Sequence, residues 1–174
     1  MRGIFQDDKK RKRIAVIGGV FACIFAAVYI VLRPATPTAD LPKQVLDLHQ
    51  FEVIQGDQAT VMVNDLHKKE VAPSVNVIGR YQSLNGYATL YRSSYASEAV
   101  AVEEFEKMAD HIRSSEGGFS HFKEFGWQGV KVYLCLGMGQ AHYYFVVKKN
   151  LYWFAVDVPI AQASLRELVR LLNG

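Results

Sequence analysis

The feature that most constrains this chain is Ile14–Leu32, a run of 19 residues without a charge. Wound as an α-helix at about 1.5 Å per residue, such a run is about 28 Å long, close to the ~30 Å hydrocarbon core of a bilayer. The basic cluster Lys9–Arg13 precedes the run, and Arg33 with Pro34 ends it. The sequence therefore predicts a basic tail (1–13), one transmembrane helix (14–32) and a larger domain behind them.

The distribution of charge predicts the orientation of this helix. Residues 1–13 hold six basic and two acidic residues, a net charge of +4, and Arg33 is the one charge that directly follows the span. Residues 34–174 hold 13 basic and 15 acidic residues, a net charge of −2. Since positive flanks stay on the cytoplasmic side, we expect a cytoplasmic N-terminus, a plasma (inner) membrane span and an extracytoplasmic domain, periplasmic in a diderm bacterium. The acidic balance of that domain argues against a nucleic-acid partner.

Two other interpretations of the apolar run are weaker. A cleavable signal peptide has an apolar core of about 7–15 residues and a cleavage site of small residues, whereas this core is longer and residues 34–39 offer a poor site. A lipoprotein attached through Cys23 would turn polar after the cysteine, but residues 24–32 stay apolar. We therefore interpret residues 14–32 as an uncleaved anchor.

Small residues form a stripe along one face of the expected anchor. Residues of this kind recur at i, i+3 and i+4, and five pairs of them stand four positions apart. Such a stripe lets two helix backbones approach closely, which is how membrane helices associate. Besides the lipid bilayer itself, the sequence thus predicts an integral membrane protein as a partner, contacted through Ala15, Gly18, Gly19, Ala22, Cys23, Ala26 and Ala27.

The span is followed by a linker, residues 33–57, and then by the domain, residues 58–174. Pro34–Pro42 contains three prolines and is expected to be a stiff, extended spacer. Lys43–Gln55 has mixed polarity and is expected to form a short helix or a docking segment.

The domain is expected to be α+β, with an antiparallel sheet covered by two helices. Asn85-Gly86 is a strong hairpin signal, because both residues tolerate positive φ. Ser97 can cap a helix from Glu98 to Arg113, and Pro159 can open a terminal helix. The order is three strands and a helix, twice over, with strands expected at Ala59–Val63, Ser74–Gln82, Tyr87–Arg92, Val130–Leu136, Ala141–Lys148 and Leu151–Val158.

Both helices show apolar faces at helical spacing. The first also carries Glu103 and Lys107 as an i,i+4 ion pair on its solvent side. The residues expected to be buried are Val102, Phe105, Ala109 and Ile112 in the first helix, and Ala161, Leu165, Leu168, Val169 and Leu172 in the second.

Two segments carry a resemblance to a known family. They are Tyr91–Ser97, which leads into the first helix, and Tyr143–Val158, in which two apolar strands flank a Lys-Lys-Asn turn. Over residues 58–172 the pattern resembles small extracytoplasmic α+β domains of the PsbP-like type. The resemblance implies an accessory or assembly subunit of a membrane complex without a shared catalytic site, and it transfers no functional residues.

The sequence offers little for catalysis or metal binding. No two histidines have His-x-x-x-His spacing, and the two cysteines do not form a Cys-x-x-Cys pair. A zinc, haem or iron–sulfur site is therefore unsupported, and we expect no cofactor. Cys135 has His142 on the next strand as its one candidate base, but an ordinary buried cysteine is the better interpretation. There is no Gly-x-Ser-x-Gly elbow and no phosphate loop. We therefore expect no enzymatic activity.

Aromatic residues are concentrated on the last three strands. Alternation sends about half of them to each face of the sheet, so one set is expected in the core and another could face a partner. Packing under helices on both faces explains the cluster equally well. The candidate partner surface is Tyr133, Tyr144, Tyr152 and Trp153.

These observations favour a non-catalytic accessory or structural subunit of a multi-subunit membrane complex, respiratory or photosynthetic for example. The alternative is a membrane-tethered module that binds a small ligand or a peptide between sheet and helix. The sequence alone gives no direct support for a small-molecule ligand.

Overall fold

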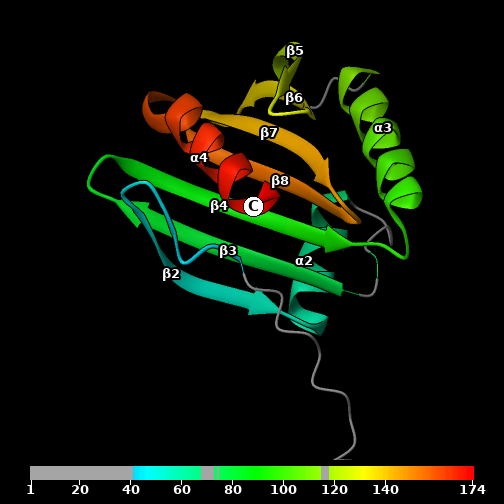
Figure 1. Ribbon diagram of the computed structural model, residues 1–174, viewed down its shortest axis with the longest axis horizontal. Coiled ribbons are helices and arrows are strands. Elements are labelled where there is room, and N and C mark those ends of the chain that lie inside the picture. Colours follow the sequence, from blue (N-terminus) through cyan, green and yellow to red (C-terminus); the bar gives the residue numbers. More distant parts are fainter. Residues whose placement is uncertain (1–40, 68–72, 74, 115–117) are drawn as a thin grey trace, which may run out of the picture. The chain divides into compact units, whose positions relative to one another are not determined.

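The structure is a computed structural model that describes residues 41–67, 73, 75–114 and 118–174 (Figure 1). These described residues belong to one compact unit. The basic tail, the expected span at 14–32 with its stripe of small residues, and the spacer before residue 41 lie outside the described residues. Within the described ranges, no helix has both the length and the apolar character needed to cross a membrane.

The described domain is α+β, with an eight-stranded antiparallel sheet of order β1-β2-β3-β4-β8-β7-β6-β5. The strands are β1 (Gln44–Val45), β2 (Leu48–Gln55), β3 (Val75–Ser83), β4 (Gly86–Ser94), β5 (Ser120–Trp127), β6 (Val130–Gly137), β7 (Gln140–Val147) and β8 (Asn150–Asp157). The helices are α2 (Asp57–His67), α3 (Glu98–Ser114) and α4 (Ala161–Asn173), and a 3₁₀ turn, η1 (Val158–Ile160), precedes α4.

Helices cover both faces of the sheet. Figure 1 shows α4 in front of the sheet and α2 behind it. Phe105 of α3 packs against Tyr133 and Tyr144, which lie in the same cross-strand row as Ile78 beneath α2. Side chains of one row share a face, so α2 and α3 cover one face and α4 the other. This double cover explains why β7 and β8 are nearly continuous apolar runs instead of alternating ones.

Five of the six expected strands are confirmed within one or two residues, but Ala59–Val63 is not a strand. This run lies inside α2, where Ala59 and Val63 are buried while Val61 between them is exposed. Burial at i and i+4 is the period of a helix. The prediction was wrong because a short apolar, β-branched run does not by itself distinguish a strand from a buried helical turn.

Two further segments join the sheet. Lys43–Gln55, expected as a helix or docking segment within the linker, contributes β1 and β2, with Leu48 and Ile54 buried. Ser120–Trp127, expected only to lead into the strands, forms β5 at the opposite edge. Edge strands bury fewer side chains and show weaker alternation, so their pattern is harder to recognise.

The two long helices largely agree with expectation. Ser97 caps α3, since the amide of Val100 donates to its Oγ at 3.3 Å, and Glu103 pairs with Lys107 at 2.7 Å. The buried face of α3 begins at Ala101, and Val102 is exposed. In α4 the buried residues are Ala161, Ser164, Leu165, Leu168 and Val169, with Leu172 half-buried.

The Asn85-Gly86 hairpin is confirmed as the connection between β3 and β4. The two residues between the strands are Leu84 and Asn85, and Gly86 is the first residue of β4. Of these three residues, only Gly86 has a positive φ, at 155°. A Cβ at Gly86 would lie 2.9 Å from Oδ2 of Asp157, so the glycine permits close approach of the end of β8.

The segment at residues 41–42 packs on the face of the sheet that α4 covers, and a glycine makes room for it. The Tyr81 hydroxyl donates to the Pro42 carbonyl at 2.9 Å, and Leu41 is buried. A Cβ at Gly79 would lie 2.9 Å from Cδ1 of Leu41 and 3.0 Å from the Tyr81 ring.

We expect Gly79→Ala to lower the free energy of unfolding by about 1–3 kcal/mol, because overpacked sites must shift their neighbours. Chemical denaturation followed by circular dichroism measures this. Gly126→Ala is the matched control, since a Cβ there meets nothing within 4 Å. Equal effects of the two substitutions would contradict the packing of residues 41–42 on β3.

Candidate functional site

Cys135 and His142, the one nucleophile–base pair suggested by the sequence, face each other in register on β6 and β7. Both are buried. Trp153 Nε1 donates to Nδ1 of His142 at 3.0 Å, and Nε2 lies 3.0 Å from the Gly137 carbonyl, which can only accept. His142 is therefore a neutral imidazole with both nitrogens occupied.

The environment of this pair opposes thiolate chemistry. Burial raises the pKa of the Cys135 thiol to about 11. Burial also lowers the pKa of His142, and the hydrogen bond to Gly137 offsets this only in part. A reactive cysteine needs a lowered pKa and a free base. Cys135 and His142 thus act as core residues.

The four aromatic residues proposed as a partner surface are placed mainly in the core. Tyr133, Tyr144 and Tyr152 are buried and Trp153 is half-buried. Tyr144 stacks on Trp153 beneath α3 with ring centroids 5.3 Å apart, while Tyr152 stacks on Phe145 on the opposite face at 5.4 Å. Of the two interpretations that the sequence left open, this burial favours core packing over an exposed aromatic surface. Its physical reason is that helices cover both faces of the sheet.

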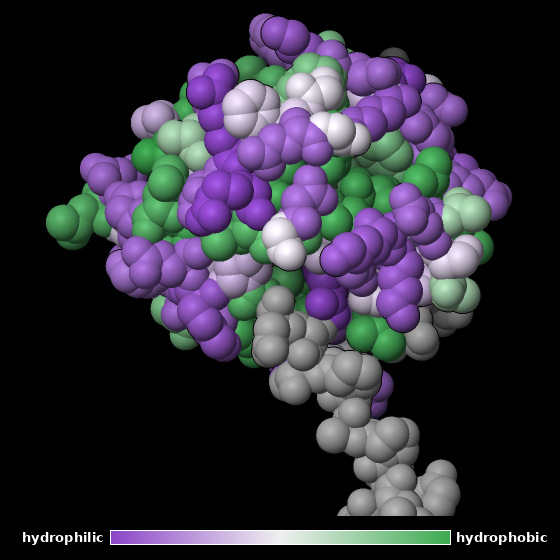
Figure 2. All heavy atoms as spheres, viewed as in Figure 1, coloured by the Kyte–Doolittle hydropathy of each residue, from purple (hydrophilic) through white to green (hydrophobic). Residues whose placement is uncertain are grey.

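Exposed apolar side chains are spread over β2, β5 and the helices, and five more lie at one end of the sheet. We call this the sheet-end surface; its members are Leu46, Leu84, Tyr87, Met138 and Val158. They come from the β1–β2 turn, the β3–β4 turn and the start of β4, the β6–β7 turn and η1, which the register places at the same end of the strands. Their exposure runs from 43% at Leu46 to full exposure at Leu84. Figure 2 shows hydrophobic surface protruding at the left, where the β3–β4 turn lies in Figure 1.

Polar bonds hold these turns together. Asn85 Nδ2 donates to Asp47 at 2.8 Å, which joins the β3–β4 turn to the β1–β2 turn. The Tyr87 amide and the Gln140 side chain both donate to Asp157, at 2.8 and 2.9 Å. The apolar side chains are therefore carried on cross-linked turns, and a partner would bind them with little loss of backbone entropy.

A charged cluster lies between α3 and β6. Lys131 Nζ lies 2.9 Å from Glu106, and the Tyr133 hydroxyl donates to the other Glu106 oxygen at 2.9 Å. Arg113 sits 4.7 Å from the centroid of the Tyr133 ring. Burial alone would raise the pKa of Glu106, but the hydrogen bonds from Lys131 and Tyr133 outweigh it and lower that pKa. The carboxylate is thus ionised and paired at neutral pH.

Beside this cluster, Tyr144 has an unusual hydroxyl. The side chain is buried, and its oxygen has no hydrogen-bond partner among the described residues. Tyr144 lines a hollow of about 140 Å³ that Arg113, Phe122 and Tyr133 also line. Burial raises the pKa of Tyr144, so the hydroxyl stays protonated and can donate. The hollow has room for a few waters or a small acceptor group.

We expect Tyr144→Phe to leave the domain at least as stable as before, with a gain of up to about 1 kcal/mol, because an unpaired buried hydroxyl is unfavourable. Tyr133→Phe is the matched comparison. It removes the bond to Glu106 and should cost about 1 kcal/mol, discounted because Glu106 is partly exposed. Chemical denaturation measures both. A clear loss of stability in Tyr144→Phe would mean that the hydroxyl is bonded to something in the hollow.

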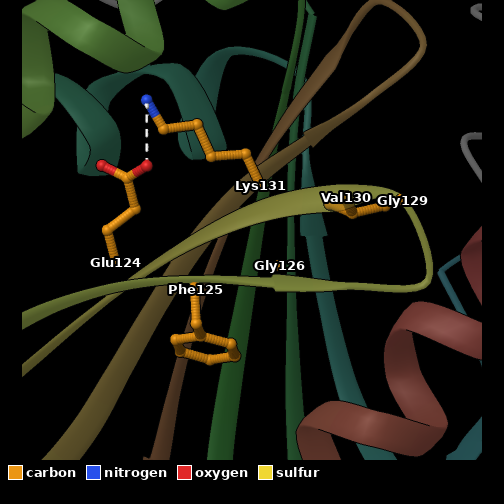
Figure 3. Close-up of a pocket in the computed structure, with 6 residues that line it drawn as sticks. All are labelled: Glu124, Phe125, Gly126, Gly129, Val130 and Lys131. Atoms are coloured by element: carbon orange, nitrogen blue, oxygen red, sulfur yellow. Dashed lines mark ion pairs between the residues drawn. The ribbon is translucent and has the colours of Figure 1, made fainter.

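A second hollow, of about 440 Å³, lies at the β5–β6 turn. Figure 3 shows Glu124 and Lys131 on one side of this hairpin, 3.7 Å apart, and Phe125 pointing to the other side. The lining side chains do not converge on a common point. This hollow is an open surface of an edge hairpin and presents no arranged set of functional groups.

Comparison with known proteins gives no match: no family model, no curated protein and no solved structure matches the chain. Among the described residues, no group of three or more His, Cys, Asp or Glu side chains could hold a metal ion. Among the described residues, the sheet-end surface is the candidate for a contact with a partner, because its apolar side chains are exposed. The sequence did not predict it because its members stand in separate turns. The available signal was apolar residues at turn positions, such as Met138 between two glycines.

Proposed function

We propose that the chain is a non-catalytic accessory subunit of a multi-subunit membrane complex. In this proposal residues 14–32 anchor it in the inner membrane, the small-residue stripe packs on a helix of an integral membrane partner, and residues 41–174 lie on the extracytoplasmic side. The charge-free run and its basic flank in the sequence support the anchor and its orientation.

The observation that carries the proposal is the sheet-end surface. Apolar side chains clustered on a rigid part of a domain mark contact sites with proteins or membranes. Leu84 is fully exposed and Met138 is 79% exposed, although both belong to well-packed hairpins. Five of the exposed apolar side chains among the described residues thus lie at one end of the sheet, which fits a subunit that works by contact.

Extraction of the full chain in a mild detergent, followed by native gel electrophoresis, tests this function. We expect migration well above the 19.6 kDa of the chain, together with resistance of the membrane-bound protein to alkaline washing. Migration only as a lone chain would count against a complex. Release by alkali would count against the anchor.

A second candidate is a membrane-tethered module that binds a small ligand. The unpartnered Tyr144 hydroxyl beside Arg113 favours it, because a protonated phenol and a guanidinium together suit a carboxylate or another small acceptor. Thermal stabilisation of the full chain by a carboxylate such as acetate, abolished in Tyr144→Phe, would favour this candidate over the first.

A further inference from the structure

The two ends of the sheet use the same kind of turn with different side chains. In the β6–β7 turn, Met138 and Gly139 have φ of 51° and 80°; in the β5–β6 turn, Gln128 and Gly129 have φ of 52° and 78°. The two turns lie at opposite ends of the sheet. Turn geometry accepts a polar residue at this position, so the exposed methionine is not required by the fold.

The same contrast extends to the other turns. At the sheet-end surface, Leu46 also occupies a left-handed position with φ of 54°, where Asn, Asp or Gly would be less strained. At the far end, Lys148 occupies the left-handed position of the β7–β8 turn with φ of 56° and is followed by Lys149. A strained position that carries an exposed apolar residue points to a use for that side chain.

The chain length before the domain limits where a membrane could lie. The eight residue steps from Arg33 to Leu41 extend at most about 26–29 Å. Leu41 contacts the middle of β3 at Gly79, and the strand runs about 14 Å from there to its end at Ser83. A tether of this length allows either end of the sheet to meet the bilayer surface. The side chains at the two ends of the sheet must therefore determine which end contacts the bilayer surface.

We propose that the sheet-end surface inserts its apolar turns into the lipid surface of the membrane that anchors the chain. This inference rests on the proposed function, since it needs the anchor. The apolar residues project from separate turns and do not line a groove, so a fluid interface accommodates them without a complementary pocket. The far end, with Lys148 and Lys149 exposed, stays in water.

Charge at the sheet-end surface shapes this contact. Its four turns contain no Lys or Arg, and the carboxylates of Asp47 and Asp157 are occupied by the bonds to Asn85, Tyr87 and Gln140. Attraction to anionic lipids therefore plays little part. Insertion depends on apolar burial, which salt does not screen.

The test uses the full chain in phosphatidylcholine vesicles that contain doxyl-labelled phosphatidylcholine as a quencher. Cys23→Ala removes one thiol, and Cys135 is buried with a raised pKa and does not label at neutral pH. A nitrobenzoxadiazole fluorophore is then attached to Leu84→Cys or, as the matched control at the far end, to Lys149→Cys. We expect strong quenching at position 84, no quenching at 149, and the same result in 0.5 M NaCl.

A matched pair of turn substitutions sharpens the result. Met138→Gln copies the residue of the far-end turn and should reduce quenching of the position 84 probe at least twofold, whereas Gln128→Met should leave it unchanged. Equal quenching at 84 and 149 in a chain that resists alkali overturns the docking but keeps the anchor. A probe at 84 that is shielded from water but not quenched by lipid indicates a protein contact and also overturns it. Release of the chain by alkali overturns the proposed function itself.

Discussion

Replacing Phe154 with Ala is expected to lower the free energy of unfolding by about 3–5 kcal/mol. Phe154 is fully buried in β8, a central strand, between Leu90 of β4 and Tyr143 of β7. Truncation removes apolar contacts on the face that α4 covers and leaves a cavity that neighbouring strands, fixed by their hydrogen bonds, cannot fill. Since domains of this size are stable by about 5–15 kcal/mol, the loss is a large part of the total.

Phe51→Ala provides the control for this prediction. Phe51 is 59% exposed on β2, beyond the two residues that pair with β1 and at the irregularity between Gln50 and Glu52. Its truncation should cost less than about 1 kcal/mol, because most of the side chain already contacts water. Urea titration of both variants, followed by circular dichroism, compares them directly. Similar midpoints for the two variants would contradict the placement of Phe154 in the core.

The sequence predicted the elements whose signals are local. Ser97 marks the start of α3 by its cap, and Asn85-Gly86 marks the β3–β4 hairpin. Elements fixed by tertiary contacts were missed. Residues 59–63 have the composition of a strand, but α2 forms because Ala59 and Val63 can be buried together against β2 and β3. Propensity is a weak guide where packing decides.

The candidate site was harder to predict than the fold. Tyr133, Tyr144 and Trp153 were candidates for a partner surface because of their residue type, yet α3 covers them. No local sequence pattern indicates which face of a sheet a helix will cover. Leu84 and Met138 were not predicted to belong to a site, because an isolated apolar residue in a turn is common. Only the antiparallel register, which brings distant turns to one end, turns them into a surface.

The second large effect is expected in the predicted anchor. Gly19→Leu should weaken association of the chain with its membrane partner on the order of tenfold, which corresponds to about 1.4 kcal/mol. Gly19 belongs to two of the small-residue pairs, with Ala15 and with Cys23. A leucine there would hold the two helix backbones apart and remove the close packing on which helix association in lipid depends. The fraction of chain in the high-mass band of a native gel, measured over a detergent dilution series, reports the change.

Val28→Leu separates this packing effect from a general change of the anchor. In the predicted helix Val28 is expected off the stripe, on the side of the larger side chains Phe21, Ile24 and Phe25. Leucine there is apolar and of similar bulk, so it preserves the length and hydrophobicity of the run while leaving the small-residue face intact. We expect the high-mass band to persist in Val28→Leu and to fade in Gly19→Leu, with both variants still retained by alkali-washed membranes. If both variants keep the band, residues 14–32 serve as an anchor alone, and the contact with the complex must lie in the extracytoplasmic domain.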